Sequence, residues 1–241
     1  MEIKNTTALV TGANRGIGKA FVAALLQSGV ARVYAAARRR DDLAAVVALD
    51  PKRVHALKLD VTKPDQIAAA AALAKDVKLL INNAGVLDFG SLLDVSADAV
   101  HRNVETNYYG MLHTTRAFVP VIEANGGGAV VNVLTLVALA SMPGLAAYNA
   151  SKAAAWSMTQ SLRADLAKRK IQVFGVFPGA VDTDMIRAVD MPKTPPLQVA
   201  QAVLEGVAAG IEDIFPDPMS QQLYAAWKAD HKAVERQFAS M

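Results

Sequence analysis

The order of short β-branched runs and longer helical runs restricts the fold of this chain more than any other feature. The two kinds of run alternate along most of the sequence, which is the pattern of β-α-β units around a parallel sheet. Strands are expected at residues 7–10, 32–36, 54–59, 79–81, 129–133 and 172–178, and helices at about 17–28, after Pro64 and at 148–169. The sequence therefore predicts an α/β fold of three layers with a doubly wound, mostly parallel sheet.

Length and composition fit a single domain with a large core. The chain has 241 residues, of which 53% are hydrophobic, and it contains no polar low-complexity segment. We therefore expect one domain over residues 1–241. The alternation lapses at about residues 183–197, where Pro192, Pro195 and Pro196 interrupt backbone hydrogen bonding. A segment of this kind is typical of a substrate flap over a site.

Charge, cysteine and histidine content exclude several function classes. Lys and Arg number 25 against 22 Asp and Glu, and only Arg38–Arg40 forms a basic cluster, so nucleic-acid binding is not expected. The chain has no cysteine and its four histidines lack metal-ligand spacing, so neither a disulfide nor a metal site is expected. No signal core precedes the first strand, and no apolar run reaches the ~20 residues of a membrane span. We expect a soluble, cytoplasmic protein.

A glycine-rich turn, TGANRGIG at residues 11–18, directly follows the first predicted strand and opens a helix. Glycines there let the backbone approach a pyrophosphate at the helix N-terminus, where free N–H groups and the helix dipole favour anions. The alternative is a turn that needs glycine only for close packing. The nucleotide interpretation predicts that the cofactor contacts Gly12, Asn14, Arg15, Gly16, Ile17 and Gly18.

The end of the second predicted strand bears on which dinucleotide binds. A carboxylate there would accept hydrogen bonds from the ribose of NAD, but this position falls near Ala37, which Arg38 follows. Arginine provides a fork for the 2′-phosphate of NADP, and Arg15 in the glycine turn can approach the same phosphate. Because these are two independent cationic positions and no acid is expected to oppose them, the sequence favours NADP(H). The alternative is that Arg38–Arg40 are merely solvated.

The segment YNASK places Tyr148 and Lys152 one helical turn apart. A phenol with a pKa near ~10 is a poor base at neutral pH, and a neighbouring ammonium can stabilise the phenolate and lower that pKa. A tyrosine positioned in this way can donate a proton to a carbonyl oxygen. By itself, however, the spacing is common and is usually just a helix surface pair.

Taken together, several motifs give the chain a strong resemblance to the short-chain dehydrogenase/reductase family. They are the glycine turn, LDVT at 59–62, NNAG at 82–85, ETN at 105–107, YNASK at 148–152 and FPGAVDTDM at 177–185. The resemblance runs from about Thr7 to Met185 in the expected order. It implies an NAD(P)-dependent oxidoreductase with a seven-stranded, Rossmann-like sheet.

Matched position by position, the resemblance assigns roles to individual residues. Tyr148 would be the acid/base, Lys152 its tuner and a ribose ligand, and Asn107 would bend its helix and hold a water in a proton relay to Lys152. Asp60 and Val61 would meet the adenine. The remaining cofactor contacts would come from Asn83, Ala84 and Gly85 in the cleft and from Pro178, Gly179, Val181 and Thr183 around the nicotinamide.

The sequence departs from the family at three places. Thr135 occupies the position of the family's serine; it keeps the hydroxyl, but its extra methyl stiffens the side chain and crowds the pocket. The run LVALA at 136–140 is bulkier than expected. The Asp-Gly-Gly ending is replaced by a short strand-like piece and an amphipathic tail, so a homo-oligomer is expected but a tetramer is not assumed. We read the site as functional, with Thr135 as its fourth catalytic residue.

The interpretation that follows is NADPH-dependent reduction of the carbonyl of an apolar ketone or aldehyde to an alcohol, which is reversible. Two alternatives stay open: a catalytically silent NADP-binding sensor or scaffold, favoured only by Thr135, and an epimerase or dehydratase that uses the same tyrosine. The apolar substrate pocket would draw on Leu134, Leu136, Met142, Leu145, Met185, Ile186 and Met191.

Overall fold

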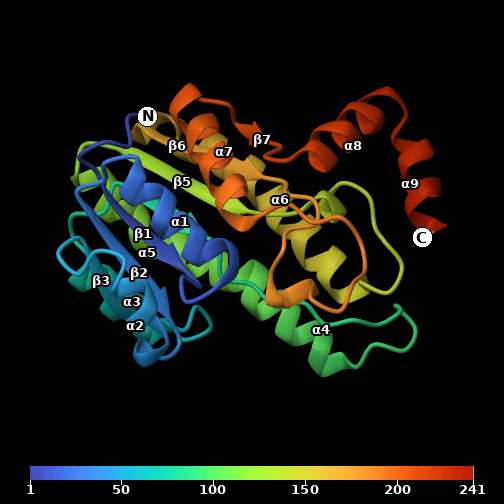
Figure 1. Cartoon of the computed structure of the whole chain (residues 1–241), viewed down its shortest axis with the longest axis horizontal. Coiled ribbons are helices and arrows are strands. Elements are labelled where there is room, and N and C mark those ends of the chain that lie inside the picture. The colour runs from blue at the N-terminus through green and yellow to red at the C-terminus, as the bar shows by residue number, and fades with distance from the viewer. Residues whose placement is uncertain (241) are drawn as a thin grey trace.

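Seven parallel strands form one sheet in this computed structural model, which describes residues 1–240 (Figure 1). Their order across the sheet is β3-β2-β1-β4-β5-β6-β7, and every neighbouring pair is parallel. The strands are β1 (Thr7–Thr11), β2 (Arg32–Ala37), β3 (Val54–Lys58), β4 (Leu79–Asn82), β5 (Gly128–Val133), β6 (Ile171–Val176) and β7 (Asp213–Ile214). The predicted doubly wound, seven-stranded α/β fold is confirmed.

Helices follow the strands and cover the sheet. They are α1 (Gly16–Gln27), α2 (Ala44–Val47), α3 (Pro64–Leu73), α4 (Ala97–Val104), α5 (Gly110–Ala124), α6 (Ala146–Leu166), α7 (Pro196–Ala209), α8 (Pro218–Ala229) and α9 (His231–Ala239). A π-helical turn η2 (Glu105–Tyr109) joins α4 to α5, and short 3-10 turns include η3 (Leu136–Ala138) and η5 (Asp184–Ile186). No helix in residues 1–240 combines the length and apolar character needed to cross a membrane.

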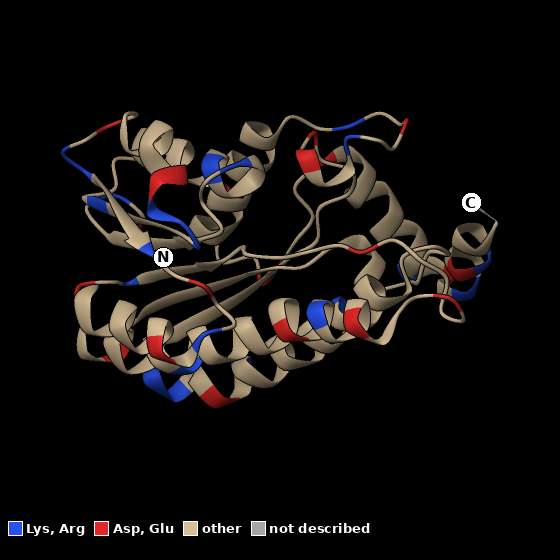
Figure 2. Cartoon of the chain, turned by 90° about the horizontal axis from the view of Figure 1, so that it is seen from below, with Lys and Arg blue, Asp and Glu red and all other residues tan. Residues whose placement is uncertain are grey.

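The sheet lies between two helical layers because its strands are apolar on both faces. Successive residues point to opposite faces, so Val10 and Ile81 join the core under α1 and α7, whereas Leu9 and Leu80 join the core under α3 and α5. Such two-sided burial is typical of a parallel sheet. Figure 2 shows the charged residues mainly on the helices and loops outside the sheet.

The strand order reverses between β1 and β4, and this reversal positions the site. β1 pairs with β2 on one side and with β4 on the other, so the crossover connections diverge at the carboxyl ends of β1 and β4. Ligands of open α/β sheets bind in the crevice that opens at such a switch point. Thr11 ends β1 and Asn82 ends β4, so the glycine turn and NNAG meet there.

The two C-terminal helices, drawn in red in Figure 1, lie on the side of the molecule away from β3. Together with residues of η3 and α6 they form a third hydrophobic cluster, which includes Leu136, Ala155, Leu223 and Phe238. Leu223 of α8 and Val234 and Phe238 of α9 are buried against Leu136 and Val137 of η3. A row of stacked rings continues this contact along Phe177, Phe215, Tyr224 and Trp227. The amphipathic tail expected from the sequence is this pair of helices.

Several element boundaries differ from those expected. β6 ends at Val176 rather than at Pro178, and α6 runs over Ala146–Leu166 rather than 148–169. After Leu166 the chain tightens into a 3-10 turn over Ala167–Arg169, and Lys170, with a left-handed φ of 57°, ends that turn before the chain enters β6. The boundary at β6 matters for function because it places the Pro178–Gly179 turn outside the sheet.

Candidate active site

Thr11 fastens the glycine turn to the NNAG segment across the switch point. Its hydroxyl oxygen accepts hydrogen bonds from the backbone N–H groups of Asn83 and Ala84, both at 3.0 Å. The Asn83 side-chain amide in turn donates to the Thr11 carbonyl at 2.9 Å and to the Gly12 carbonyl at 3.2 Å. The Asn83 side chain therefore has a structural role in addition to its predicted contact with the cofactor, because it holds the glycine turn and the NNAG segment together.

The glycine turn has the shape and the free donors that a pyrophosphate requires. Gly12 has φ of 64°, and a Cβ on Gly18 would lie 2.1 Å from the Gly12 carbonyl oxygen, so the turn closes only with glycines. Arg15 is the N-cap of α1, but no side chain caps that helix and no acid stands in its first turn. The first N–H groups of α1 thus fit an anion. Asn14 is partly buried in the turn, and Ile17 packs on the core below it.

Arg38 lies where a 2′-phosphate would be expected. Ala37 is buried at the end of β2, and Arg38 follows it exposed, with no ion pair to any residue in 1–240. Arg39, by contrast, is bound by Asp42 at 2.8 Å. The expectation that no acid opposes the two cations is wrong for Arg15, because Asp184 of η5 lies 3.6 Å from its guanidinium.

The two residues expected at the adenine are partly committed to local structure. One Asp60 carboxylate oxygen accepts from the backbone N–H and the hydroxyl of Thr62, at 3.0 and 2.8 Å, which closes a tight turn after β3. Val61 is buried, and its side chain abuts Gly110 at the start of α5, where a Cβ would lie 2.7 Å away. Their contact with the adenine stays a prediction.

Tyr148, Lys152 and Thr135 come together where β5 meets α6. The Thr135 hydroxyl is within hydrogen-bonding reach of Tyr148. Lys152 is 3% exposed, its ammonium donates to the Val133 carbonyl at 2.7 Å, and it lies 5.8 Å from the Tyr148 ring centroid. The structure therefore brings the threonine, tyrosine and lysine of the predicted site into one place.

Burial controls the ionisation of this group more than charge pairing does. Desolvation raises the pKa of Tyr148 to about 12, and only the hydrogen bond from Thr135 opposes it. Desolvation also lowers the pKa of Lys152 to about 8. The expectation that Lys152 pulls the pKa of Tyr148 down is therefore not met in this structure. The lysine ammonium is hydrogen-bonded to Val133 instead of contacting the phenol oxygen.

Asn107 lies in an irregular part of its helix, where the resemblance predicts a bend. It is fully buried in the π-helical turn η2, a local widening that frees its side chain from ordinary helical packing. Its carbonyl oxygen accepts from the Val86 N–H at 2.9 Å, and its amide donates to the Val86 carbonyl and to the Ser151 hydroxyl, each at 2.9 Å. Asn107 thus joins the segment after NNAG to α6, one residue before Lys152.

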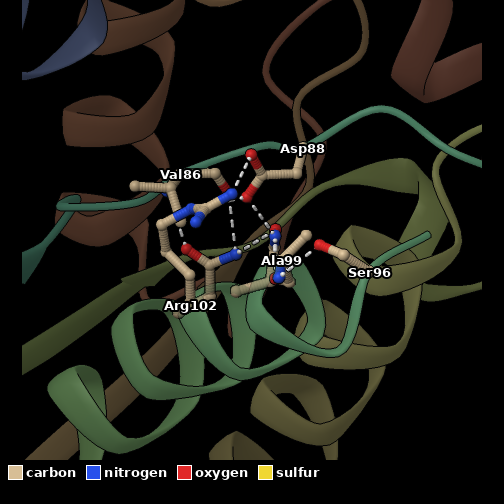
Figure 3. Close-up of polar contacts among 7 residues, drawn as sticks. Val86, Asp88, Ser96, Ala99 and Arg102 are labelled. Atoms are coloured by element: carbon tan, nitrogen blue, oxygen red, sulfur yellow. Dashed lines mark hydrogen bonds and ion pairs between the residues drawn. The ribbon is translucent and has the colours of Figure 1, made fainter.

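A hydrogen-bonded network that runs from buried Asn103 to the exposed side chain of Arg102 supports Asn107 from α4, and Figure 3 shows Asp88 facing Arg102 within it. Asn103 is fully buried; its amide donates to Asp88 at 2.7 Å, and its carbonyl oxygen accepts from Asn107 at 3.5 Å. Arg102 forms a two-point ion pair with Asp88, at 3.0 and 2.7 Å, which holds the pKa of the Asp88 carboxyl below its usual range. These contacts fix the loop that follows NNAG.

Gly85 separates Asn107 from Lys152 in a narrow gap. A Cβ on Gly85 would lie 3.2 Å from the Asn107 carbonyl oxygen and 3.8 Å from the Lys152 ammonium. Any side chain at this position would fill the space between the two polar groups. The arrangement is consistent with a water between Asn107 and Lys152, which stays a prediction.

The segment after β6 reaches across the crevice to the glycine turn. The Pro178 carbonyl accepts from the Leu136 N–H at 3.2 Å, next to Thr135, and Val181 forms an isolated β-bridge with Thr194. The Thr183 methyl lies 3.1 Å from where a Cβ of Gly16 would be. Residues 178–183 therefore pass between Thr135 and the start of α1.

The predicted apolar pocket is only partly assembled. Leu134 and Leu136 are buried in the third cluster, and Met142 and Leu145 pack on it together with Tyr148. Met185, Ile186 and Met191 do not belong to this cluster, and Met185 is 42% exposed. Only Met142 and Leu145 are both partly accessible and beside the tyrosine, so they are the strongest candidates for substrate contact.

Sequence reasoning missed several supporting residues. Ser151, three residues after Tyr148, and Asn103, one turn before Asn107, could have been found from helical spacing. Asp217 starts the run Asp-Pro-Met-Ser, a recognisable helix N-terminus. Its second contact, with Gly179 at 2.9 Å, joins residues 38 positions apart and has no local signal. Within residues 1–240, no group of His, Asp and Glu could hold a metal ion.

Comparisons with known proteins agree with this geometry. The family model for short chain dehydrogenases matches residues 6–193. An uncharacterized oxidoreductase of Staphylococcus haemolyticus is 32% identical over 211 residues, which cover 84% of this chain and 91% of that protein.

Two solved structures extend the similarity over nearly the whole fold. A short chain dehydrogenase from Burkholderia cenocepacia in complex with NADP has a TM-score of 0.93 and 38% identity, with 99% of each chain covered. A short chain dehydrogenase/reductase from Burkholderia phymatum in complex with NAD has a TM-score of 0.88 and 26% identity, covering 98% of this chain and 96% of that one. With the switch-point crevice and the Tyr148–Lys152 pair, these matches establish that the chain belongs to the short-chain dehydrogenase family of oxidoreductases.

Proposed function

We propose that this protein reduces the carbonyl group of an apolar ketone or aldehyde to an alcohol, with NADPH as the reductant. The observation that carries the proposal is the grouping of Thr135, Tyr148 and Lys152 beside the crevice between β1 and β4. Bound NADPH supplies a hydride to the carbonyl carbon. The Tyr148 hydroxyl gives its proton to the carbonyl oxygen, and the Thr135 hydroxyl donates a hydrogen bond to the same oxygen.

Ionisation supports the reductive direction. A tyrosine with a pKa of about 12 is protonated at neutral pH, which is the state that a proton donor requires. Lys152, with a pKa of about 8, is mostly charged at neutral pH and can stabilise the phenolate left after transfer. Alcohol oxidation, the reverse reaction, needs a deprotonated tyrosine and is therefore expected to increase as the pH rises.

Arg38 supports NADPH over NADH. The compared structures contain NADP in one case and NAD in the other, so the fold accepts both and residues at the ribose must decide. Here the end of β2 has Ala37 and an unpaired Arg38 in place of a carboxylate. A guanidinium binds phosphate through two parallel hydrogen bonds, whereas it gains little from a ribose hydroxyl.

The test of the reaction is loss of reduced-nicotinamide absorbance with a panel of apolar ketones and aldehydes. Tyr148→Phe should abolish NADPH consumption while leaving NADPH affinity nearly unchanged, because it removes only the proton donor. Tyr109→Phe, which alters an exposed ring, is the matched control and should retain activity. Tight NADPH binding without turnover of any carbonyl would instead favour a silent sensor or scaffold.

The test of cofactor choice compares two neighbouring arginines. Arg38→Ala should weaken NADPH binding about tenfold or more and leave NADH binding unchanged, because only NADPH has the 2′-phosphate. Arg39→Ala removes an equal charge that Asp42 already binds, so its effect should be small. Equal losses for the two cofactors in Arg38→Ala would contradict the assignment. The single domain, the flap at 183–197, the homo-oligomer and the cytoplasmic location stay predictions.

A further inference from the structure

Asp217 is a buried carboxylate in the part of the chain that departs from the family pattern. It is 1% exposed and forms no ion pair within residues 1–240. A buried, unpaired carboxylate is costly unless hydrogen bonds satisfy its oxygens. In this structure each of its two oxygens accepts a hydrogen bond from a backbone N–H group.

One oxygen of Asp217 caps α8. Oδ1 accepts from the Ser220 N–H at 2.9 Å, and the Ser220 hydroxyl oxygen accepts from the Asp217 N–H at 3.1 Å, which completes a capping box. The positive end of the helix dipole also stabilises the carboxylate. These contacts would satisfy an ordinary N-cap and need no partner outside α8.

The second oxygen of Asp217 bonds to a residue outside α8, in the turn that follows β6. Oδ2 accepts from the Gly179 N–H at 2.9 Å. A Cβ on Gly179 would lie 2.8 Å from Asp217 Oδ1 and 2.9 Å from the Met219 sulfur, so the turn fits against α8 only as glycine. The first residues of α8 are therefore in direct contact with the Pro178–Gly179 turn.

That turn is held from two sides. The Pro178 carbonyl accepts from the Leu136 N–H, adjacent to Thr135, while Asp217 holds the next residue, Gly179. From there the chain continues to Val181 and Thr183, and Thr183 lies against the start of α1. A displacement of Gly179 would therefore also displace Val181 and Thr183.

Asp230 provides a natural comparison because it is the N-cap of the next helix, α9. Its Oδ1 accepts from the Ala233 N–H at 3.0 Å, as Asp217 accepts from Ser220. Its Oδ2, however, lies 3.7 Å from Arg236 of the same helix, and its side chain is 56% exposed. Of these two N-cap residues, only Asp217 also bonds to a residue of the candidate site.

We propose that Asp217 is a positioning residue for the nicotinamide side of the cofactor cleft, acting through Gly179 on residues 178–183. The carboxylate bonds the capped end of α8 to the turn and so keeps Val181 and Thr183 at the distance that the nicotinamide half of NADPH requires. The proposal rests on the proposed function, since it takes NADPH as the ligand. It gives the C-terminal helices a part in cofactor binding.

The experiment measures by titration calorimetry the affinity of each variant for two ligands. One is NADPH and the other is 2′-phospho-ADP-ribose, which has the same adenine, phosphates and ribose but lacks nicotinamide. Asp217→Asn places an N–H₂ group against one of the two N–H donors and breaks that contact. NADPH affinity should fall about tenfold, whereas 2′-phospho-ADP-ribose affinity should stay within twofold. A merely structural loss would weaken both ligands together.

Matched controls loosen the C-terminal helices without touching Gly179. Asp230→Ala removes the cap of α9, and Ser220→Ala removes the hydroxyl half of the capping box while keeping the N–H from which Asp217 Oδ1 accepts. Both should bind the two ligands as the wild type does. Should Asp217→Asn fail to fold, Asp217→Ser decides the question, because serine keeps one oxygen to cap α8 but has no second oxygen for the Gly179 N–H, and it should weaken NADPH selectively.

The failures of the two proposals can be told apart. If the wild type binds both ligands and neither Asp217→Asn nor Asp217→Ser discriminates between them, the role of Asp217 is overturned while the proposed function stands. If the wild type does not bind NADPH, the proposed function is overturned and the role of Asp217 with it.

Discussion

The cofactor crevice and the C-terminal helices are held together by different kinds of contact. In the crevice, Thr11 and Asn83 join backbone groups of two motifs, and glycines allow the backbones to meet without side chains. At the C-terminus, aromatic rings stack from Phe177 to Trp227, and one carboxylate makes the polar link to the site. The first region is defined by backbone geometry and the second by side-chain packing.

This difference determines how each region tolerates change. Backbone hydrogen bonds and missing Cβ atoms leave almost no freedom in the crevice, because a single added carbon collides with a carbonyl. Apolar packing is less directional, so α8 and α9 can vary in sequence while still burying the same surface. Mutations in the two regions should accordingly separate cofactor binding from stability.

The largest effect is expected for Gly18→Ala, which tests the rigidity of the crevice. The new Cβ would lie 2.1 Å from the Gly12 carbonyl oxygen and 2.6 Å from the Asn83 side-chain nitrogen. Affinity for NADPH and for 2′-phospho-ADP-ribose should fall together, on the order of a thousandfold, or about 4 kcal/mol. Calorimetric titration of both ligands measures this.

The control for that change is Gly210→Ala, at the C-cap of α7. Gly210 has a left-handed backbone, with φ of 74°, which Gly18 does not have, but nothing lies within 4 Å of its missing Cβ. It should cost only about 1 kcal/mol of stability from backbone strain and leave ligand binding intact. Ligand binding by Gly18→Ala at wild-type affinity would remove the distinction between the two regions.

An effect of similar size, but confined to stability, is expected for Phe238→Ala in α9. Phe238 is 5% exposed in the third cluster, so truncation leaves a cavity and should lower the free energy of unfolding by about 3–5 kcal/mol. NADPH affinity should stay within twofold. Thermal denaturation measures the loss, with Leu93→Ala, at an exposed leucine, as the control that should change stability little. A Phe238→Ala variant of full stability with weakened NADPH binding would reverse the comparison.

The smallest effect concerns Lys152, which lies between the two regions. Folding lowers its pKa from an ordinary value of 10.5 to about 8, so the unfolded chain binds more protons between these pH values. Stability should therefore rise with pH from about 8 to 10.5, by on the order of 3 kcal/mol at most. Tyr148 acts oppositely only above pH 10, where its raised pKa makes the folded state retain a proton.

Denaturant unfolding at several pH values, for the wild type and Lys152→Met, isolates this contribution. The methionine variant keeps the aliphatic volume but cannot titrate, so the unfolding free energy of the wild type minus that of the variant should increase as the pH rises from 8 to 10. A difference that is constant with pH would mean that Lys152 keeps its ordinary pKa in the folded protein.

Much of the fold and of the crevice could be predicted because the relevant physics is local. Alternating strand and helix runs require a parallel sheet, and glycines between a strand and a helix identify the turn where β1 meets α1. Tyr148 and Lys152 share a helix face because they are four residues apart. Arg38 could likewise be placed at the end of β2 because it directly follows that strand in the sequence.

The sheet, the glycine turn and the spacing of Tyr148 and Lys152 follow from the sequence alone, since these depend on backbone geometry and short-range periodicity. The contacts of Asp184 with Arg15, of the Lys152 ammonium with Val133 and of Asp217 with Gly179 appear only in the folded structure. Those contacts depend on the packing of segments far apart in the chain, and on the burial that sets the ionisation of Tyr148 and Lys152, neither of which any short stretch of sequence contains.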